Sequence, residues 1–265
     1  MDKTIELVNA IKDIQAMPSV IVRVLNVMKK PTVSMKELGD IVMYDQSLTI
    51  KILALVNSAY YGFSQQISSI SIALSLLGMV KVKNIIVAVA MKPMMSNAGD
   101  KELWKHSIRV AAGCEYLAKL TKIMDPDEAF IAGFIHDVGK IVLHTTNPKV
   151  YDKVVNCVLE GADILDAERK YFDSDHVKTG SLLAKWWKLP ILLANIVSYH
   201  HNPSLSSIPV PCNLVCAVDK LMQENFNPSM LDKDFMKTMG IDLDDVEDLR
   251  VAIRQKAELL ISELT

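Results

Sequence analysis

Apolar residues recur every three or four positions in one short segment after another of this chain, and that spacing most strongly constrains its fold. Residues 20–28 carry this pattern, and so does the segment from Leu48 to Val56. Such spacing places apolar side chains on one face of a helix, whereas a strand needs alternation of apolar and polar residues. No segment alternates strongly enough to predict a strand. The sequence therefore predicts an all-α fold.

Composition and capping signals agree with helices. Half of the residues are hydrophobic and only 6% are aromatic, a balance that suits packed helices better than a β-sandwich. Ser34 and Glu37 have the spacing of a capping box, and Asp45 is placed to cap the helix that carries Leu48. Helix starts are therefore predicted at residues 35 and 46.

A chain of 265 residues can hold one large domain or two modest ones. The small polar stretch at residues 96–100 has the composition of a linker. We therefore predict a helical N-terminal domain over residues 1–98 and a second helical domain over residues 99–225. Residues 226–265 are predicted to form an acidic segment followed by an amphipathic helix.

Charge and apolar content exclude several kinds of partner. The net charge is −2 and the pI is about 6.3, without a block of Lys and Arg, so nucleic acid is not an expected partner. The four cysteines lie in apolar contexts and are expected to be reduced core thiols. The longest unbroken apolar run, residues 85–91, is far too short to span a membrane. We expect a cytoplasmic protein without membrane contact.

Five of the six histidines form an ordered series with three acidic residues between residues 102 and 219. The series comprises Glu102, His106, His136, Asp137, His176, His200, His201 and Asp219. Imidazole and carboxylate are the usual ligands of divalent transition metals. Taken singly, each residue more often caps a helix or lies at the surface, as Asp175 would cap a helix and leave His176 exposed. Together they predict a metal site.

Lys140 and Glu102 are the charged residues with helical spacing to this series. Lys140 lies one turn after His136 if the helix is continuous, on the side where it can meet a phosphate. Residues 136 and 137 would then point only about 100° apart, into one pocket. Glu102 and His106 are four residues apart and share a helix face.

Two groups of motifs resemble known families. Residues 103–107 (Leu-Trp-Lys-His-Ser), 132–140 (Ala-Gly-Phe-Ile-His-Asp-Val-Gly-Lys) and 199–201 (Tyr-His-His) resemble the HD superfamily of metal-dependent phosphohydrolases. Residues 17–20 (Met-Pro-Ser-Val), 55–62 (Leu-Val-Asn-Ser-Ala-Tyr-Tyr-Gly) and 67–70 (Ile-Ser-Ser-Ile) are similar to the HDOD (HD-related output domain) family of bacterial signalling proteins. The resemblance runs from about residue 14 to residue 222.

The resemblance implies a helical N-terminal subdomain packed on an HD-type helical domain, and it implies roles for the series. A first metal ion would be bound by His106, His136, Asp137 and Asp219. A second ion, as in HD-GYP phosphodiesterases, would be bound by His176, His200 and His201 with Asp137 as the bridge. Glu102 would be an extra carboxylate ligand, and Asp137 and Lys140 would be catalytic, with Lys140 contacting the scissile phosphate. The expected ions are two divalent metals, iron or manganese ahead of nickel or zinc.

The chain departs from its relatives in two ways. HDOD members have commonly lost many of these ligands and are usually treated as non-catalytic, whereas this chain retains all of them. The Gly-Tyr-Pro loop of cyclic di-GMP phosphodiesterases is missing from residues 141–150, which argues against cyclic di-GMP as the substrate.

Three functions remain open on the sequence. The first is a metal-dependent phosphohydrolase of phosphodiesterase type that acts on a phosphate ester or nucleotide. The second is a non-catalytic signalling module whose N-terminal half binds a partner protein, and the third is a purely structural helical protein. The aromatic residues Tyr60, Tyr61 and Phe63 would be either core or interface, and we expect core.

Overall fold

The computed structural model describes residues 19–28, 34–58, 61–97 and 101–264, and every regular element in these ranges is a helix. The predicted all-α fold is confirmed. Met17, Pro18, Tyr60 and residues 98–100 of the expected linker lie outside the described residues, and the predicted domain boundaries stay predictions.

The α-helices are α2 (Ser19–Met28), α3 (Met35–Met43), α4 (Gln46–Val56), α5 (Ile70–Asn97), α6 (Lys101–Thr121), α7 (Pro126–Ile135), α8 (Gly139–Thr146), α9 (Pro148–Leu159), α10 (Ile164–Phe172), α11 (His176–Trp186), α12 (Ile191–Tyr199), α13 (Pro209–Met222), α14 (Lys233–Thr238) and α15 (Val246–Leu264). The 3₁₀ turns are η1 (Pro203–Leu205), η2 (Pro228–Met230) and η3 (Leu243–Asp245).

The predicted caps of α3 and α4 are present. The Ser34 hydroxyl accepts a hydrogen bond from the Glu37 amide at 3.2 Å, and the Glu37 carboxylate accepts one from the Ser34 amide at 3.3 Å. Asp45 accepts one from the Leu48 amide at 3.0 Å. These bonds satisfy amides that the first turn of a helix leaves without an intrahelical partner. The capping residues therefore determine where α3 and α4 begin.

Helix α5 is sharply bent at Gly78. Its two halves are joined through Gly78 at φ +79°, a conformation that glycine adopts readily. The helix axis turns by 107° between the two segments, Ile70–Met79 and Lys81–Met95. In the described part of the chain no single helix is long and apolar enough to cross a membrane, and this bent pair alone reaches that length and composition when its halves are counted together.

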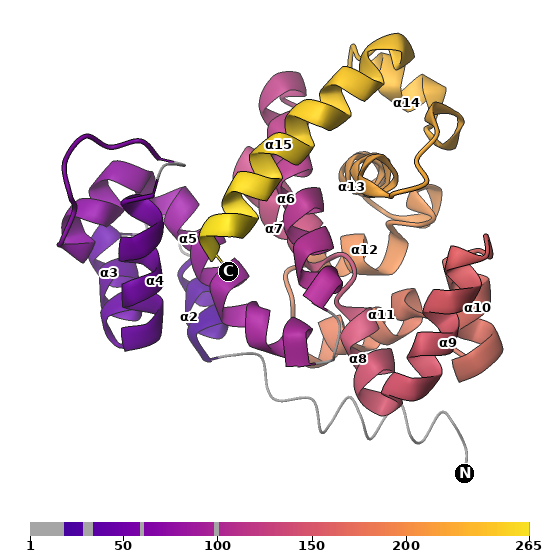
Figure 1. Ribbon diagram of the computed structural model, residues 1–265, viewed down its shortest axis with the longest axis horizontal. Coiled ribbons are helices and arrows are strands. Elements are labelled where there is room, and N and C mark those ends of the chain that lie inside the picture. The colour runs from indigo at the N-terminus through magenta and orange to yellow at the C-terminus, as the bar shows by residue number, and fades with distance from the viewer. Residues whose placement is uncertain (1–18, 29–33, 59–60, 98–100, 265) are drawn as a thin grey trace.

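The N-terminal helices α2, α3 and α4 pack on α5, which in turn contacts α6 and α7 (Figure 1). Asn57, in the most specific HDOD-like motif, holds the loop after α4. Its side-chain amide oxygen accepts from the Ile67 amide, and its side-chain nitrogen donates to the Ile67 carbonyl, both at 2.7 Å. Tyr61 and Phe63 stack in this loop, but Phe63 is 39% exposed. The expectation that it is core is therefore wrong, because the pinned loop lies at the surface.

Helices α6 and α7 form the scaffold of the second half, and α15 runs diagonally across α6 (Figure 1). Gly133 allows close contact, since a Cβ there would lie 2.9 Å from the Val110 carbonyl oxygen and 3.0 Å from the Ala111 Cα. The close approach of α6 and α7 fixes the direction of α7, and so the position of the residues that follow it.

Helix α7 ends at Ile135, and α8 begins only at Gly139. The continuous helix expected through His136 and Lys140 is therefore wrong. The break lies where α8 meets α11, because a Cβ on Gly139 would be 1.9 Å from the carbonyl oxygen of His176. The turn directs His136 and Asp137 toward the N-terminus of α11.

Candidate metal centre

The turn between α7 and α8 buries His136 and Asp137, each 1% exposed. The Nδ1 atom of His136 lies 2.7 Å from the Gly133 carbonyl oxygen. A carbonyl oxygen can only accept, so Nδ1 carries a proton and the ring is held with Nε2 directed into the interior. Burial opposes a charge on His136, but Asp137 and Asp219 outweigh it and raise its pKa to about 10.

One set of donor atoms, which we call the His106 group, consists of His106, His136 and Asp219. His106 comes from α6 and Asp219 from α13, and His106 Nε2 is 3.0 Å from Asp219 Oδ1. His136 Nε2 is 3.6 Å from the same oxygen. All three donors lie within 4.8 Å of one another, so three helices separated in the chain converge on one point.

A second set, the His176 group, consists of Asp137, His176, His200 and His201. His176 begins α11, and its Nε2 lies 3.4 Å from His200 Nε2 and 3.0 Å from His201 Nε2. Burial, with His200 and His176 nearby, lowers the pKa of His201 to about 2. Burial also lowers the pKa of His200, so His200 and His201 favour the neutral imidazole form that binds metals.

Asp137 lies between the two groups, and its two oxygens face different ones. Oδ2 is 3.3 Å from His136 Nε2 and 3.7 Å from His106 Nε2. Oδ1 is 3.3 Å from His176 Nε2 and 3.6 Å from His200 Nε2. Burial would raise the pKa of Asp137, but His136, Lys140 and His176 hold it well below its usual range. A single ionised carboxylate thus connects both sets of imidazoles.

The donor set fits divalent metal ions. His136 Nε2 is buried and has no hydrogen-bond partner, and three imidazole nitrogens of the His176 group face one another at 3.0 to 3.4 Å or are joined through Asp137. Ligands about 2.0 to 2.2 Å from one ion lie roughly 3 to 3.5 Å apart. The spacing therefore matches ligands around an ion better than rings that satisfy one another.

Glu168 supports the His176 group, and the sequence analysis missed it. This fully buried carboxylate on α10 lies 2.7 Å from His176 Nδ1 and accepts from the His176 backbone amide at 2.7 Å. Tyr151 donates to its other oxygen at 3.3 Å. A carboxylate on the distal nitrogen orients a ligand histidine and increases its basicity. The available signal was position, since Glu168 lies on the helix face of Leu165 and Phe172.

The cap predicted at Asp175 is present, because Asp175 accepts from the Lys178 amide at 2.8 Å. His176 is nevertheless 0% exposed, so the alternative in which this histidine lies at the surface is wrong. His200 is also buried, and its Nδ1 lies 3.1 Å from the Ile196 carbonyl oxygen. Both rings are oriented through their distal nitrogen, as His136 is.

Lys140 and Glu102 lie at the edge of the centre. Lys140 Nζ is 2.5 Å from Asp137 Oδ2, so the salt bridge spans the α7–α8 turn. Glu102 belongs to neither group: its side chain is 66% exposed and pairs with Lys105 at 2.6 Å. Both line an open cleft of about 210 Å³ that His106 also lines. A ligand role for Glu102 stays a prediction.

The sequence profile of the HDOD domain matches residues 14–203. This chain belongs to the HDOD family. The match ends before Asp219, which the fold nevertheless brings to His106. An uncharacterized protein of Treponema pallidum is 27% identical over 206 residues, which are 74% of this chain and 39% of that protein. The HDOD chain thus spans well under half of this relative.

Solved structures share the fold of this HDOD protein. An HDOD domain protein of unknown function from Geobacter sulfurreducens has a TM-score of 0.77 at 22% identity, covering 96% of this chain and 99% of that one. A protein from Shewanella amazonensis, provisionally named a phosphohydrolase, has a TM-score of 0.74 at 21% identity, covering 98% of each chain. Structural similarity at 21 to 22% sequence identity establishes the shared fold alone.

Proposed function

We propose that this HDOD protein is a metal-dependent phosphohydrolase of phosphodiesterase type, acting on a phosphate ester or a nucleotide. The observation that carries the proposal is the position of Asp137, whose two oxygens face two separate groups of imidazoles. A carboxylate shared between two ions is the recurring arrangement of two-metal phosphoryl-transfer sites. The provisional name of the Shewanella structure agrees with this reading.

In this proposal the His106 group holds one divalent ion and the His176 group holds a second, with Asp137 shared. Nitrogen and carboxylate ligands without thiolate favour iron or manganese, with nickel and zinc as the other candidates. When bound, such ions polarise a phosphoryl oxygen and make water nucleophilic at neutral pH. Glu168, Gly133 and Ile196 fix the ligand rings before any ion arrives.

Lys140 is the residue assigned to the substrate phosphate. Burial works against its charge, but Asp137 outweighs burial and raises the pKa of Lys140 above its usual range. The ammonium group therefore stays protonated, at the point where the cleft meets Asp137. A fixed cation there stabilises negative charge that develops on phosphoryl oxygens.

The cleft indicates what the rest of the substrate looks like. Opposite His106 and Lys140, its wall is apolar and comes from Val155, Val158 and Leu159 of α9. Leu159 is 80% exposed, so burying it against a ligand would remove apolar surface from water. A phosphate ester with a flat or apolar alcohol part, such as a nucleotide, suits this wall.

A second candidate is a non-catalytic signalling module that binds metal and contacts a partner protein through its N-terminal half. One observation favours it: α3 and α4 expose Met43 (57%), Tyr44 (80%) and Ile50 (58%). Exposed large apolar side chains close together are typical of protein-binding surfaces.

The two candidates are separated by assay of the metal-loaded protein. The panel comprises bis(p-nitrophenyl) phosphate, mononucleotides and cyclic dinucleotides, each with wild type, Asp137→Asn and Lys140→Gln. Lys149→Gln, an exposed lysine on α9, is the matched control. We expect turnover by wild type and control, and a loss of about 100-fold or more in both site variants. Activity unchanged in Asp137→Asn would refute the proposal, and a metal-loaded protein without turnover would favour the signalling module.

A further inference from the structure

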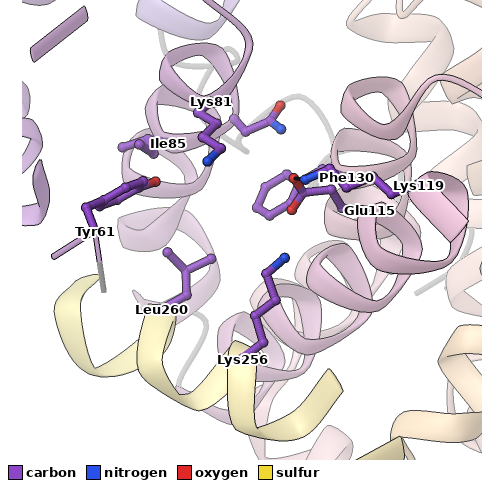
Figure 2. Close-up of a pocket in the computed structure, with 9 residues that line it drawn as sticks. Tyr61, Lys81, Ile85, Glu115, Lys119, Phe130, Lys256 and Leu260 are labelled. Atoms are coloured by element: carbon purple, nitrogen blue, oxygen red, sulfur yellow. Dashed lines mark hydrogen bonds and ion pairs between the residues drawn. The ribbon is translucent and has the colours of Figure 1, made fainter. Parts of the chain in front are cut away.

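A second polar pocket lies away from the histidines, where α5, α6, α7 and α15 meet (Figure 2). It is a small, partly open cavity of about 50 Å³. Its polar lining consists of Lys81 and Asn84 from α5, Glu115 and Lys119 from α6, and Lys256 from α15. We call it the lysine pocket. It joins the helix that supports the N-terminal half to the helix that carries His106.

The charges in this pocket do not balance. Glu115 is 9% exposed and forms a short ion pair with Lys119. Figure 2 shows the amino groups of Lys81 and Lys256 directed into the same space from opposite sides. Among the described residues, neither has a carboxylate within 4 Å, and Lys81 instead lies 5.5 Å from the centre of the Tyr61 ring. Two lysines therefore face the cavity without an ion pair, because Glu115, the one carboxylate of the lining, is paired with Lys119.

Burial and the neighbouring positive charges lower the pKa of Lys256. Burial has the largest effect, Glu115 acts against it, and Lys119 and Lys81 lower the pKa further. An ammonium group that repels its neighbours gains most from an anion placed between them. A bound anion would therefore offset the repulsion between these lysines.

Asn84 provides an independent sign that a ligand binds here. It lines the pocket and is 5% exposed, yet its side-chain oxygen is buried without a hydrogen-bond partner. Buried polar atoms in native proteins are nearly always paired. A half-turn of the amide exchanges its oxygen and nitrogen, so Asn84 can donate to an oxyanion or accept from a hydroxyl group of the same ligand.

We propose that the lysine pocket is a binding site for a small phosphate-bearing anion, held by Lys81, Lys256 and Asn84. Three donors around a cavity suit the tetrahedral oxygens of phosphate. Tyr61, Phe130 and Leu260 give the pocket an apolar wall, and its small volume favours a free phosphate over a whole nucleotide. The inference is independent of the proposed hydrolysis, because none of these residues belongs to the His106 or His176 group.

The site is tested by calorimetric titration of chelator-treated protein with inorganic phosphate and, separately, with AMP. We expect one equivalent to bind. Lys81→Gln and Lys256→Gln should each weaken binding about tenfold, since each removes one charge-assisted hydrogen bond. Asn84→Ala should weaken it less. The tighter of the two probes identifies whether the pocket takes free phosphate or a nucleotide.

Two controls keep the test specific. Lys149→Gln removes an exposed lysine elsewhere and should leave the calorimetric affinity unchanged. Lys140→Gln removes the lysine next to Asp137 and distinguishes binding in the lysine pocket from binding at the metal centre. Circular dichroism checks that each variant is folded. The proposal is overturned if neither probe binds wild type up to about 10 mM, a concentration well above useful affinities. Binding abolished by Lys140→Gln and kept by Lys81→Gln and Lys256→Gln would also overturn it.

Discussion

The His106 group and the His176 group share Asp137 but are held in different ways. In the His176 group, His176 and His200 are completely buried, and each ring is fixed through its distal nitrogen by Glu168 or by a carbonyl oxygen. In the His106 group, His136 is held in the same way by the Gly133 carbonyl oxygen, but His106 has a side chain 22% exposed, lies at the cleft and contacts Asp219 directly. The comparison indicates an inner half that is rigid before binding and an outer half that faces the substrate.

This difference predicts unequal metal affinities. Preorganised ligands lose less conformational entropy when an ion binds, so the His176 group should bind its ion more tightly than the His106 group. The predictions below test how far the two halves are separate, beginning with Asp137, whose two oxygens face both groups.

Asp137→Ala should cause the largest loss, because both halves lose a ligand and two sets of imidazoles lose the charge between them. We expect bound metal, measured by mass spectrometry of dialysed protein, to fall from about two equivalents toward zero. A ligand should matter more than its supporting partners, whose loss costs about 10- to 100-fold. Asp152→Ala, an exposed aspartate on α9, is the control. Retention of two equivalents by Asp137→Ala would show that Asp137 is not the shared ligand.

Gly139→Ala should disturb the inner half through the backbone. The added methyl would lie 1.9 Å from the His176 carbonyl oxygen and 2.6 Å from the Gly180 nitrogen, so α8 and α11 must separate. We expect a loss of about 3 kcal/mol, or a melting temperature lower by about 6 to 12 °C. Thr145→Ala on the exposed face of α8 should change little. An unaltered melting curve for Gly139→Ala would mean that the close contact is not maintained in solution.

His106→Ala and His201→Ala should each remove one ion, and they compare the halves directly. His106→Ala should leave the tightly bound ion in place, whereas His201→Ala should weaken the inner site and leave an ion at the His106 group. Competition with a chromogenic chelator distinguishes the two, since the remaining ion differs in affinity. Identical curves for both variants would indicate one undivided site.

Glu168→Gln should have the smallest effect of the series. The substitution keeps the shape of the side chain but removes the negative charge that faces His176 Nδ1. We expect the ion of the His176 group to bind about 10- to 100-fold more weakly, with the His106 group unchanged. Equal weakening of both ions would show that Glu168 acts on the fold as a whole.

The grouping of the histidines could be predicted from sequence, because the chain has only six of them and five fall in one series. Imidazole and carboxylate together are typical of metal ligands. The helix caps at Ser34 and Asp45 were predictable because they depend on neighbouring residues alone. The N-terminal motif was predictable as a family signature, and its structural reason, the Asn57 bonds across the loop, required the fold.

Other features depend on contacts that no local pattern specifies. The break after Ile135 follows from the approach of Gly139 to His176, which are 37 positions apart. In the sequence Glu168 is an ordinary helix carboxylate, and only the fold shows that it contacts His176. The lysine pocket is the extreme case, because lysines are common and only the meeting of α5, α6 and α15 brings Lys81 and Lys256 to one cavity.

The central claim is that Asp137 joins two metal ions, and anomalous diffraction from crystals of the metal-loaded protein tests it most directly. The account predicts two anomalous peaks about 3.5 to 4 Å apart, one beside His106, His136 and Asp219 and one beside His176, His200 and His201, with Asp137 between them. No peak at Asp137, or peaks only at other positions in loaded crystals, would contradict it.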